Sequence, residues 1–385
     1  MIDRRGVRLN RRVVQIVLIC GAVALATALR LRAVDLLPAD FDEDNYLRAA
    51  QGYAAAIRTG DWAPPLTTDE LIEHPALGTL VFGAVIAPLP PAPEIPFRRL
   101  SSPPDDTLPE PHWTVARLAA GALGVATVGA LALLDPLAAI LLATSSWHIK
   151  YTSQVMLEAL GALASLATVL LYLRSRGRSN RALAGSAVAL GLTAATKYVY
   201  ALVGLAIAVD WIIRRLTPNG QRSLRPLLAW GALAVAVFFA ANPELWADPA
   251  GRLAASLSFH SGYAAGPSVR NAALPAWQPL VWLSQPVPWH PGVFLLTMDA
   301  LVSLAALIGL PGTWKRRPVI AIWLLLALTF LLAWPTKWPQ YTIVLSVPLS
   351  LCAAEGLRSL VAPIRGLYAE ATARGCTRWL PGCRS

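Results

Sequence analysis

Long apolar segments constrain this chain more than any other feature of its sequence. Of its 385 residues, 56% are hydrophobic and only 14% are charged, and the mean hydropathy is +0.52. A soluble domain usually carries about 25% charged residues. Segments of about 20 apolar residues are long enough to cross a bilayer as α-helices. The sequence therefore predicts an all-α, polytopic membrane protein whose single integral membrane domain spans residues 1–385.

Ten apolar segments are counted as crossings. The first follows "MIDRRGVRLNRR" and resembles a signal peptide, but the many later segments favour an uncleaved first transmembrane helix. Two long connections, 38–115 and 242–290, separate the segments, and residues 358–385 follow the last one as a tail. The predicted spans are 13–34, 116–134, 137–153, 155–173, 182–197, 199–213, 226–241, 291–310, 318–334 and 340–357.

One region admits two interpretations. Residues 116–147 are apolar except for Arg117 and "LDPL" at 134–137, so they form either a hairpin of two crossings or one long helix. The second interpretation makes "PALGTLVFGAVIAPLP" a crossing instead. We favour the hairpin, because about 30 helical residues would extend roughly 45 Å. An Asp-Pro pair is also a good turn sequence.

Lysine and arginine are concentrated on one side of this topology. Segments 1–12, 174–181, 214–225, 315–317 and 356–385 hold 21 of the 33 basic residues, and all of them share one face if the helices alternate. The positive-inside rule makes that face, with both termini, cytoplasmic. Loop 38–115, with twelve acids and four basic residues, then lies outside. The net charge of +11 thus reflects topology, and we expect no nucleic-acid partner.

Four acids crowd the start of the first outer loop, in "ADFDEDNYLRAA" at residues 39–50. Asp40, Asp42, Glu43 and Asp44 precede a short predicted helix in "NYLRAAQGYAAAIRTG". Acids favour the N-terminal end of a helix, but that accounts for only one or two of them. Two functional interpretations are open: a general base that takes a proton from an acceptor hydroxyl, and a divalent-cation site.

Other polar residues share the outer compartment. His74 precedes Pro75 in the same loop, and Lys150, Lys197 and Lys337 lie at predicted outer helix ends in a chain that keeps most cations inside. Each lysine is explained either by snorkelling to the interface or by binding an anionic phosphate.

Tryptophans also gather on this side. Nine of the fourteen lie in outer loops or at outer helix ends. They form either an interfacial aromatic belt or, in addition, a wall that contacts sugar or lipid, since aromatic rings offer flat apolar surfaces.

Five motifs in a fixed order resemble the GT-C superfamily of membrane glycosyltransferases. Within it, the chain is most similar to the branch of dolichyl-phosphate-mannose protein mannosyltransferases and bacterial aminoarabinose transferases. The resemblance covers most of residues 10–357. The motifs are "FDEDNYLRAA", "HPALGTL", "YTSQVMLEAL", "TKYVY" and "KWPQYTIVLSVPLSLCAAEGL".

The resemblance implies a GT-C fold with about ten transmembrane helices, two large outer loops, and a site in the first of them. The matching acid pair is Asp42–Glu43, His74 matches a His-Pro motif, and Lys337 and Tyr341 match a late Lys-Tyr motif. It implies an inverting glycosyltransferase, a hexosyl or pentosyl transferase. Such an enzyme moves a sugar from a polyprenyl-phosphate donor to an extracytoplasmic acceptor.

In this mechanism Asp42 is the general base, and with an ordinary carboxyl pKa near 4 it would be a weak one. Lys337 would offset charge on the leaving phosphate, with Lys197 and Arg117 as further candidates. Membrane lipids and an acceptor (protein, lipid or glycan) are the other expected partners. No organic cofactor and no metal ligand are expected, although the divalent-cation interpretation stays open.

The chain departs from the family pattern in three ways. Ala76 stands where the family usually has the second proline of His-Pro-Pro, and loop 242–290 is too short for a separate soluble domain. The second and third predicted helices are also compressed around Asp135–Pro136. Three other classes are weighed: a secondary transporter or lipid flippase, a polysaccharide polymerase or ligase, and an inactive scaffold. Transporters keep ionisable groups at mid-membrane and often show internal repeats. This sequence shows neither.

Overall fold

A computed structural model of the chain describes residues 11–67, 73–96, 108–175, 179–217 and 223–379, without the side chains of 11 and 363–379. Within these ranges the chain forms helices and connections, and no strand. The helices are α1 (Arg11–Leu36), α2 (Glu43–Thr59), α3 (Ala63–Thr67), α4 (Leu77–Ile86), α5 (His112–Leu134), α6 (Pro136–Ala143), α7 (Ser146–Tyr151), α8 (Glu158–Ser175), α9 (Asn180–Thr196), η1 (Tyr198–Ala201), α10 (Leu202–Arg215), α11 (Arg225–Ala240), η2 (Pro243–Leu245), α12 (Pro249–Ala264), α13 (Pro267–Ala272), α14 (Gln278–Leu283), α15 (Asp299–Arg316), α16 (Pro318–Ala333), η3 (Pro339–Thr342) and α17 (Ile343–Trp379).

Every predicted span contains a helix, so the all-α multi-pass class is confirmed. Four helical segments in the described residues are long and apolar enough to cross a membrane: Arg12–Leu36, His112–Leu134, Glu158–Ser175 and Pro339–Ala362. α4, α11 and α16 are shorter apolar helices. The total of about ten crossings stays a prediction.

The chain breaks at Asp135, as the hairpin interpretation expects. Asp135 has an extended backbone (φ −159°, ψ 100°), and its carboxylate accepts hydrogen bonds from the amides of Leu137 and Ala138 at 3.2 and 3.3 Å. Pro136 takes the first helical position, where its missing N–H is not needed. The interpretation of 116–147 as one long helix is therefore wrong. α4, the helix of the companion crossing, has 10 residues and extends about 15 Å. α6, in the second arm of the hairpin, has 8 residues and extends about 12 Å, and the chain leaves the helix again at Thr144 before α7. Which of the two crosses the membrane stays a prediction.

Three predicted boundaries differ from the structure. Residues 152–157, placed at the junction of two spans, are irregular between α7 and α8, and residues 291–298 precede the start of α15 instead of opening it. A Pro-Gly pair at 291–292 disfavours helix there. α17 continues through most of the predicted tail, to Trp379. The tail's last residues, 380–385, and most of the first predicted cytoplasmic segment lie outside the described residues.

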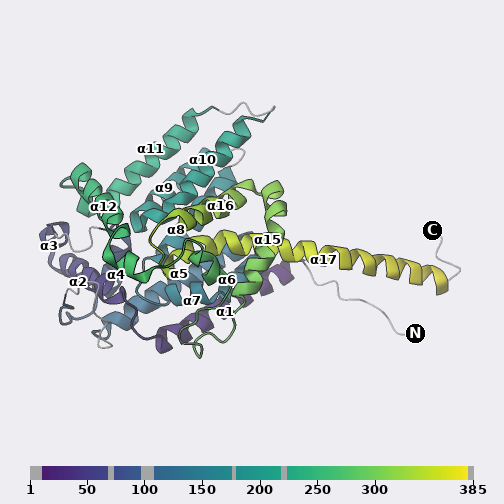
Figure 1. The fold of residues 1–385 in the computed structure, drawn as a ribbon, viewed down its shortest axis with the longest axis horizontal. Coiled ribbons are helices and arrows are strands. Elements are labelled where there is room, and N and C mark those ends of the chain that lie inside the picture. Colours follow the sequence, from purple (N-terminus) through teal and green to yellow (C-terminus); the bar gives the residue numbers. More distant parts are fainter. Residues whose placement is uncertain (1–10, 68–72, 97–107, 176–178, 218–222, 380–385) are drawn as a thin grey trace.

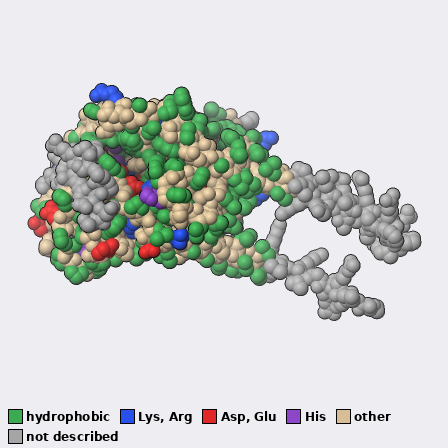
Figure 2. Space-filling model, turned by 60° about the horizontal axis from the view of Figure 1, so that its bottom comes forward, with side chains coloured by type: hydrophobic (Ala, Val, Ile, Leu, Met, Phe, Trp, Pro, Cys, Tyr) green, Lys and Arg blue, Asp and Glu red, His purple; other side chains and the backbone are tan. Residues whose placement is uncertain are grey.

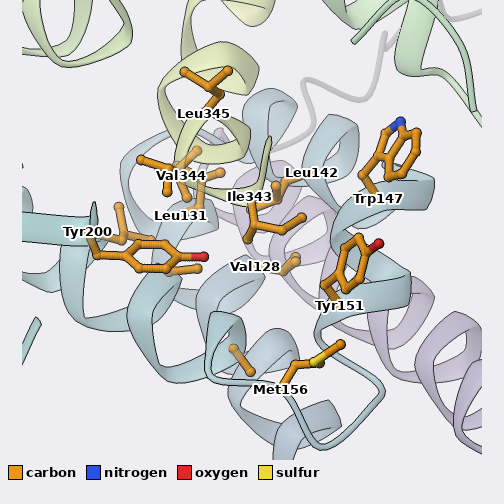
Figure 3. Close-up of a cluster of buried hydrophobic side chains, with 14 of the residues drawn as sticks. Val128, Leu131, Leu142, Trp147, Tyr151, Met156, Tyr200, Ile343, Val344 and Leu345 are labelled. Carbon is orange, nitrogen blue, oxygen red and sulfur yellow. The ribbon is translucent and has the colours of Figure 1, made fainter. Parts of the chain in front are cut away.

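The core lies where α5, α6 and α7 meet the start of α17. Figure 3 shows Leu131 of α5, Leu142 of α6 and Ile343 of α17 grouped together, with Trp147 and Tyr151 of α7 beside them. All are buried. This packing holds α7 and the irregular 152–157 segment in place, and both contribute to the site described below.

The two ends of the molecule differ in character. α1 begins and α17 ends at one end, whereas α2, α3 and α12 lie at the opposite end (Figure 1). Figure 2 shows acidic side chains gathered toward that opposite end, while hydrophobic side chains cover much of the remaining face. The two predicted outer loops therefore come together at the end of the molecule away from α17's terminus.

Helices α15 and α17 approach each other through two glycines. A Cβ atom built on Gly356 would lie 1.9 Å from the carbonyl oxygen of Ala305, and one on Gly309 would lie 1.9 Å from that of Cys352. Side chains of any other residue would force these helices apart.

We expect Gly356→Ala to lower the thermal unfolding temperature, because overpacking a closely fitted contact costs about 1–3 kcal/mol. The matched control is Gly231→Ala in α11, where nothing lies within 4 Å of the added Cβ and a small gain is expected from helix propensity. Thermal denaturation of the two purified variants in the same detergent measures the difference. Equal melting temperatures would contradict the close contact.

Candidate active site

The structure separates the four clustered acids. Asp40 and Asp42 line a cavity, whereas Glu43 and Asp44 are buried in the first turn of α2. Asp42 is the N-cap residue of α2, yet its side chain makes no capping hydrogen bond. Asp44 is thus a helix-start acid, but it is buried and not exposed to solvent, and Asp40 pairs with Lys150.

Glu43 and Arg117 form a buried ion pair. Arg117 Nη2 lies 2.5 Å from Glu43 Oε2, and Arg117 Nε donates to Oε1 at 2.8 Å. Glu43 Oε1 also accepts from the indole of Trp113 at 3.2 Å and from the amide of Val155 at 2.7 Å. The rest of the guanidinium donates to backbone carbonyls at the end of α1: Val34, Leu37 and Pro38. This placement commits both residues to internal contacts away from the cavities that Asp42 borders.

Asp42 is half-buried and has the electrostatic environment of a base. Gln340 donates to Asp42 Oδ2 at 3.3 Å. The surrounding protein raises the pKa of Asp42 to about 7, mainly because burial disfavours the charged form; Lys197 lowers it and Asp40 raises it. The pKa near 4 expected from the sequence is thus too low. A carboxyl that titrates near pH 7 is well suited to general base catalysis.

Asp42 lies where two cavities meet. The larger is about 550 Å³ and contains Asp40, Lys150 and Trp289; the smaller is about 80 Å³ and contains Glu73, His74 and Lys197. Four residues line both cavities: Asp42, Tyr263, Trp338 and Gln340.

A third, largely apolar hollow adjoins the smaller cavity. Its volume is about 260 Å³, and Leu202 of α10 and Phe330 and Trp334 near α16 line it. The hollow and the smaller cavity share four residues, His74, Lys197, His260 and Tyr341. These four therefore stand between an apolar surface and Asp42.

Lys197 is the charged member of that group. Its Nζ lies 2.5 Å from Glu158 Oε1 and 5.1 Å from the centre of the Tyr341 ring. The His74 and His260 rings are 5.8 Å apart, and His260 Nε2 contacts the carbonyl of Glu73 at 2.6 Å. Burial lowers the pKa of both His74 and His260, and the nearby Lys197 lowers each further. Both imidazoles thus offer hydrogen bonds without adding positive charge.

Lys337 has a different environment. Its Nζ donates to the carbonyls of Leu331 and Leu332 at 2.8 and 3.1 Å and also to that of Trp334, so it caps the C-terminal end of α16. Burial lowers the pKa of Lys337. It is not among the residues that line the two Asp42 cavities. The structure therefore brings Lys197, Tyr341 and His74 toward Asp42, and it directs Lys337 and Arg117 elsewhere.

Ala76, which stands in place of the second proline of a His-Pro-Pro motif, makes a backbone hydrogen bond that proline could not make. The amide of Ala76 donates to Asn242 Oδ1 at 2.8 Å, and this bond ties the first outer loop to the second. Proline has no N–H and would lose it.

Sequence reasoning missed several lining residues. Trp338 and Gln340 lie between Lys337 and Tyr341 in the late motif, so that motif was itself a signal for them. His260 and Tyr263 are three residues apart in α12, the spacing that places two side chains on one helix face. Only the packing of α12 against the first outer loop brings them to Asp42.

Within the described ranges, no group of three or more His, Cys, Asp or Glu side chains is placed to hold a metal ion. Asp40 and Asp42 are the carboxylates of the larger cavity, and Asp40 already pairs with Lys150. The divalent-cation interpretation stays an untested prediction.

Three solved structures are similar to this chain. ArnT from Cupriavidus metallidurans, bound to undecaprenyl phosphate or in the apo state, is 16% identical, with TM-scores of 0.58 and 0.57; each match covers 92% of this chain and 63% of ArnT. The S. cerevisiae protein O-mannosyltransferase Pmt1-Pmt2 complex bound to the sugar donor is 16% identical, with a TM-score of 0.45, and the match covers 64% of this chain and 33% of that one. No protein-family model and no curated protein matches.

These findings concern the fold. The chain has the GT-C fold seen in ArnT, which confirms the fold class expected from the sequence. It spans less than two thirds of the ArnT chain's length.

We expect Glu43→Ala to destabilise the protein by about 3–5 kcal/mol, because removing one partner leaves the buried Arg117 charge uncompensated. Glu94→Ala, at an exposed position in the same loop, is the matched control and should change stability little. Chemical denaturation of the detergent-solubilised variants measures both. A Glu43 variant as stable as the control would show that the pair does not organise this end of the molecule.

Proposed function

We propose that this protein is an inverting glycosyltransferase that moves a sugar from a polyprenyl-phosphate donor to an acceptor hydroxyl, with Asp42 as general base. One observation carries the proposal. Asp42, with a pKa raised to about 7, stands between a wide cavity and a polar cavity that continues past Lys197 into an apolar hollow. A base, a cation and an apolar surface are the three features that this reaction needs.

The donor would occupy the smaller cavity and the hollow. Its polyprenyl chain would pack against Leu202 and Phe330, and its phosphate would face Lys197 and the Tyr341 hydroxyl. His74, whose Nδ1 has no hydrogen-bond partner among the described residues, is a further donor or acceptor for this group. The solved ArnT structure contains undecaprenyl phosphate, a lipid of the same class, which supports the choice.

The acceptor would enter through the larger cavity. Asp42 takes the proton of the acceptor hydroxyl as its oxygen attacks the anomeric carbon. The bond between that carbon and the phosphate oxygen breaks on the opposite face, and the electron pair leaves with the polyprenyl phosphate, so configuration inverts. Preorganised charge such as Lys197 stabilises the leaving phosphate. Glu43 and Arg117 act as positioning residues that fix the start of α2.

The site would face out of the cytoplasm, with both chain termini inside. Basic residues concentrated on one side of the topology and acidic side chains gathered at the end holding α2 and α12 (Figure 2) support this orientation. A lipid flippase or a polysaccharide polymerase would not catalyse transfer of one sugar from a purified polyprenyl-phosphate donor, so an in vitro assay with a donor panel separates these classes.

Asp42→Asn should reduce sugar transfer at least about 100-fold, the contribution usual for a general base. In the wild type, activity should rise with pH and level off above about 7, because the pKa of Asp42 is raised and only the deprotonated carboxylate accepts a proton. Asp61→Asn, at an exposed acid in the same loop, should retain both rate and profile. Transfer from a radiolabelled donor across pH 5–9 provides the measurement. Near-normal turnover of Asp42→Asn would move the base elsewhere, with Asp40 next.

Lys197→Met and Lys337→Met should differ in their effect on the donor KM. Loss of the phosphate-binding cation should raise the donor KM of Lys197→Met about tenfold or more, since hydrogen bonds to charged groups are worth about 1.5–3 kcal/mol. Lys337→Met removes a helix cap and should leave the donor KM unchanged. Both variants should lower the melting temperature, since Lys197→Met leaves the buried Glu158 carboxylate uncompensated. Steady-state kinetics with varied donor, paired with thermal denaturation, measures both. An increase in KM for Lys337→Met alone would reverse the assignment.

A further inference from the structure

We infer that the acceptor is an uncharged carbohydrate, and that Asp40 excludes anionic acceptors by neutralising Lys150. The inference rests on the proposed function and adds the acceptor class to it. It follows from the charges and aromatic rings that line the larger cavity.

The cation of this cavity is already engaged. Lys150 Nζ pairs with the carboxylate of Asp40 and donates to Gln154 Oε1 at 2.9 Å. It also lies 4.7 Å from the centre of the Tyr151 ring. The Lys150 side chain is only 6% exposed, and that of Asp40 is 21% exposed. Among the described residues, Asp40 and Gln154 take two of the three N–H groups of Lys150, whereas Lys197, which we propose faces the donor phosphate, donates only to Glu158. The cavity side of the Lys150 pair presents a carboxylate.

The remaining charge is negative. Apart from His290 at the exposed rim, the ionisable acids and bases that line the cavity besides tyrosine are Asp40, Asp42 and Lys150. With Asp42 ionised as the base, these three sum to one negative charge. A phosphate or carboxylate acceptor would bring like charge next to two carboxylates, which is unfavourable. Neutral hydroxyl-bearing acceptors suffer no such repulsion.

Aromatic rings form much of the cavity wall. They come from five parts of the chain: Phe41 before α2, Tyr151 in α7, Tyr263 in α12, Trp289 in the connection before α15, and Trp338 before η3. Phe41 and Trp289 remain 44% and 45% exposed. The C–H faces of sugar rings pack well on flat apolar surfaces of this kind, while Ser268 and Gln340 around the same cavity offer polar groups to their hydroxyls.

Two contacts hold Trp289 and the connection that carries it in place. Trp289 packs edge-on against Trp147 of α7, with ring centres 6.0 Å apart. Arg32 of α1 donates to the carbonyl of Gly292 at 2.8 Å and anchors the same connection. A fixed aromatic surface suits a rigid ring better than an extended peptide, whose recognition usually depends on backbone hydrogen bonds along a strand or groove. The cavity's volume of about 550 Å³ is also in the range of small-ligand sites.

The test is a binding measurement without donor. The full chain in nanodiscs is titrated by saturation-transfer NMR with methyl α-mannoside, methyl β-glucoside, maltose and cellobiose. The charged probes are mannose 6-phosphate and glucose 6-phosphate, and the peptide probe is blocked Ala-Ser-Thr-Ala. We expect at least one neutral sugar to bind, both phosphorylated sugars to bind more weakly, and the peptide not to bind.

Four variants, one of them a control, locate the binding. Trp289→Ala should weaken sugar binding about tenfold, whereas Trp277→Ala, which removes a tryptophan that is 62% exposed outside this cavity, should not change it. Asp40→Asn should free Lys150 and raise the affinity for the phosphorylated sugars. Lys150→Gln should lower the affinity for the phosphorylated sugars further, relative to that for neutral sugars, so the charge argument is tested even where one variant folds poorly.

Tighter binding of a phosphorylated sugar or of the peptide by the wild type would overturn the inference, and so would no binding of any neutral sugar. These outcomes are independent of the transfer reaction, since no donor is present. Failure of the proposed function would instead appear as normal turnover of Asp42→Asn.

Discussion

The organisation of this molecule depends on the buried Glu43–Arg117 pair. Charged groups are expensive inside a membrane protein unless they are paired and fully hydrogen-bonded. Here the carboxylate accepts from Arg117, Trp113 and the amide of Val155, and the guanidinium satisfies carbonyls at the end of α1. One interaction thus joins α1, α2, α5 and the irregular 152–157 segment. Its neighbour Asp42, the base we propose, is positioned by that junction without contributing to it.

Four acids of one short motif consequently have four different environments. Glu43 is an internal anchor, Asp44 is buried in the first turn, Asp40 pairs with Lys150, and Asp42 faces two cavities. Composition and the positive-inside rule predict that all four lie in the outer compartment. Their separate roles depend on which partner each meets from α5, from α7 or from η3, and no local pattern contains that information.

The sequence predicts most of the helices, because apolar length and the Asp135–Pro136 break are local properties. It does not predict the irregular segment at 152–157, whose backbone is stabilised by the distant Glu43 carboxylate. The roles of the site residues are likewise only partly predictable from the sequence. Lys197 and Lys337 look equivalent in sequence, since both sit at outer helix ends. The free carbonyls at the end of α16 bind one of them, and the carboxylate of Glu158 holds the other beside Tyr341.

Lys197 also couples the two halves of the proposed reaction. Its charge lowers the pKa of Asp42, opposing the larger effect of burial. If a donor phosphate binds Lys197 as we propose, its negative charge offsets that of the ammonium group and the pKa of Asp42 rises further. Asp42 would then be a stronger base when the donor is present than when it is absent. As the bond to the phosphate breaks, negative charge develops beside Lys197, and the carboxylate of Asp42 is neutralised by the acceptor's proton. The two changes favour each other electrostatically, which gives a physical reason for placing the cation and the base beside the same cavity.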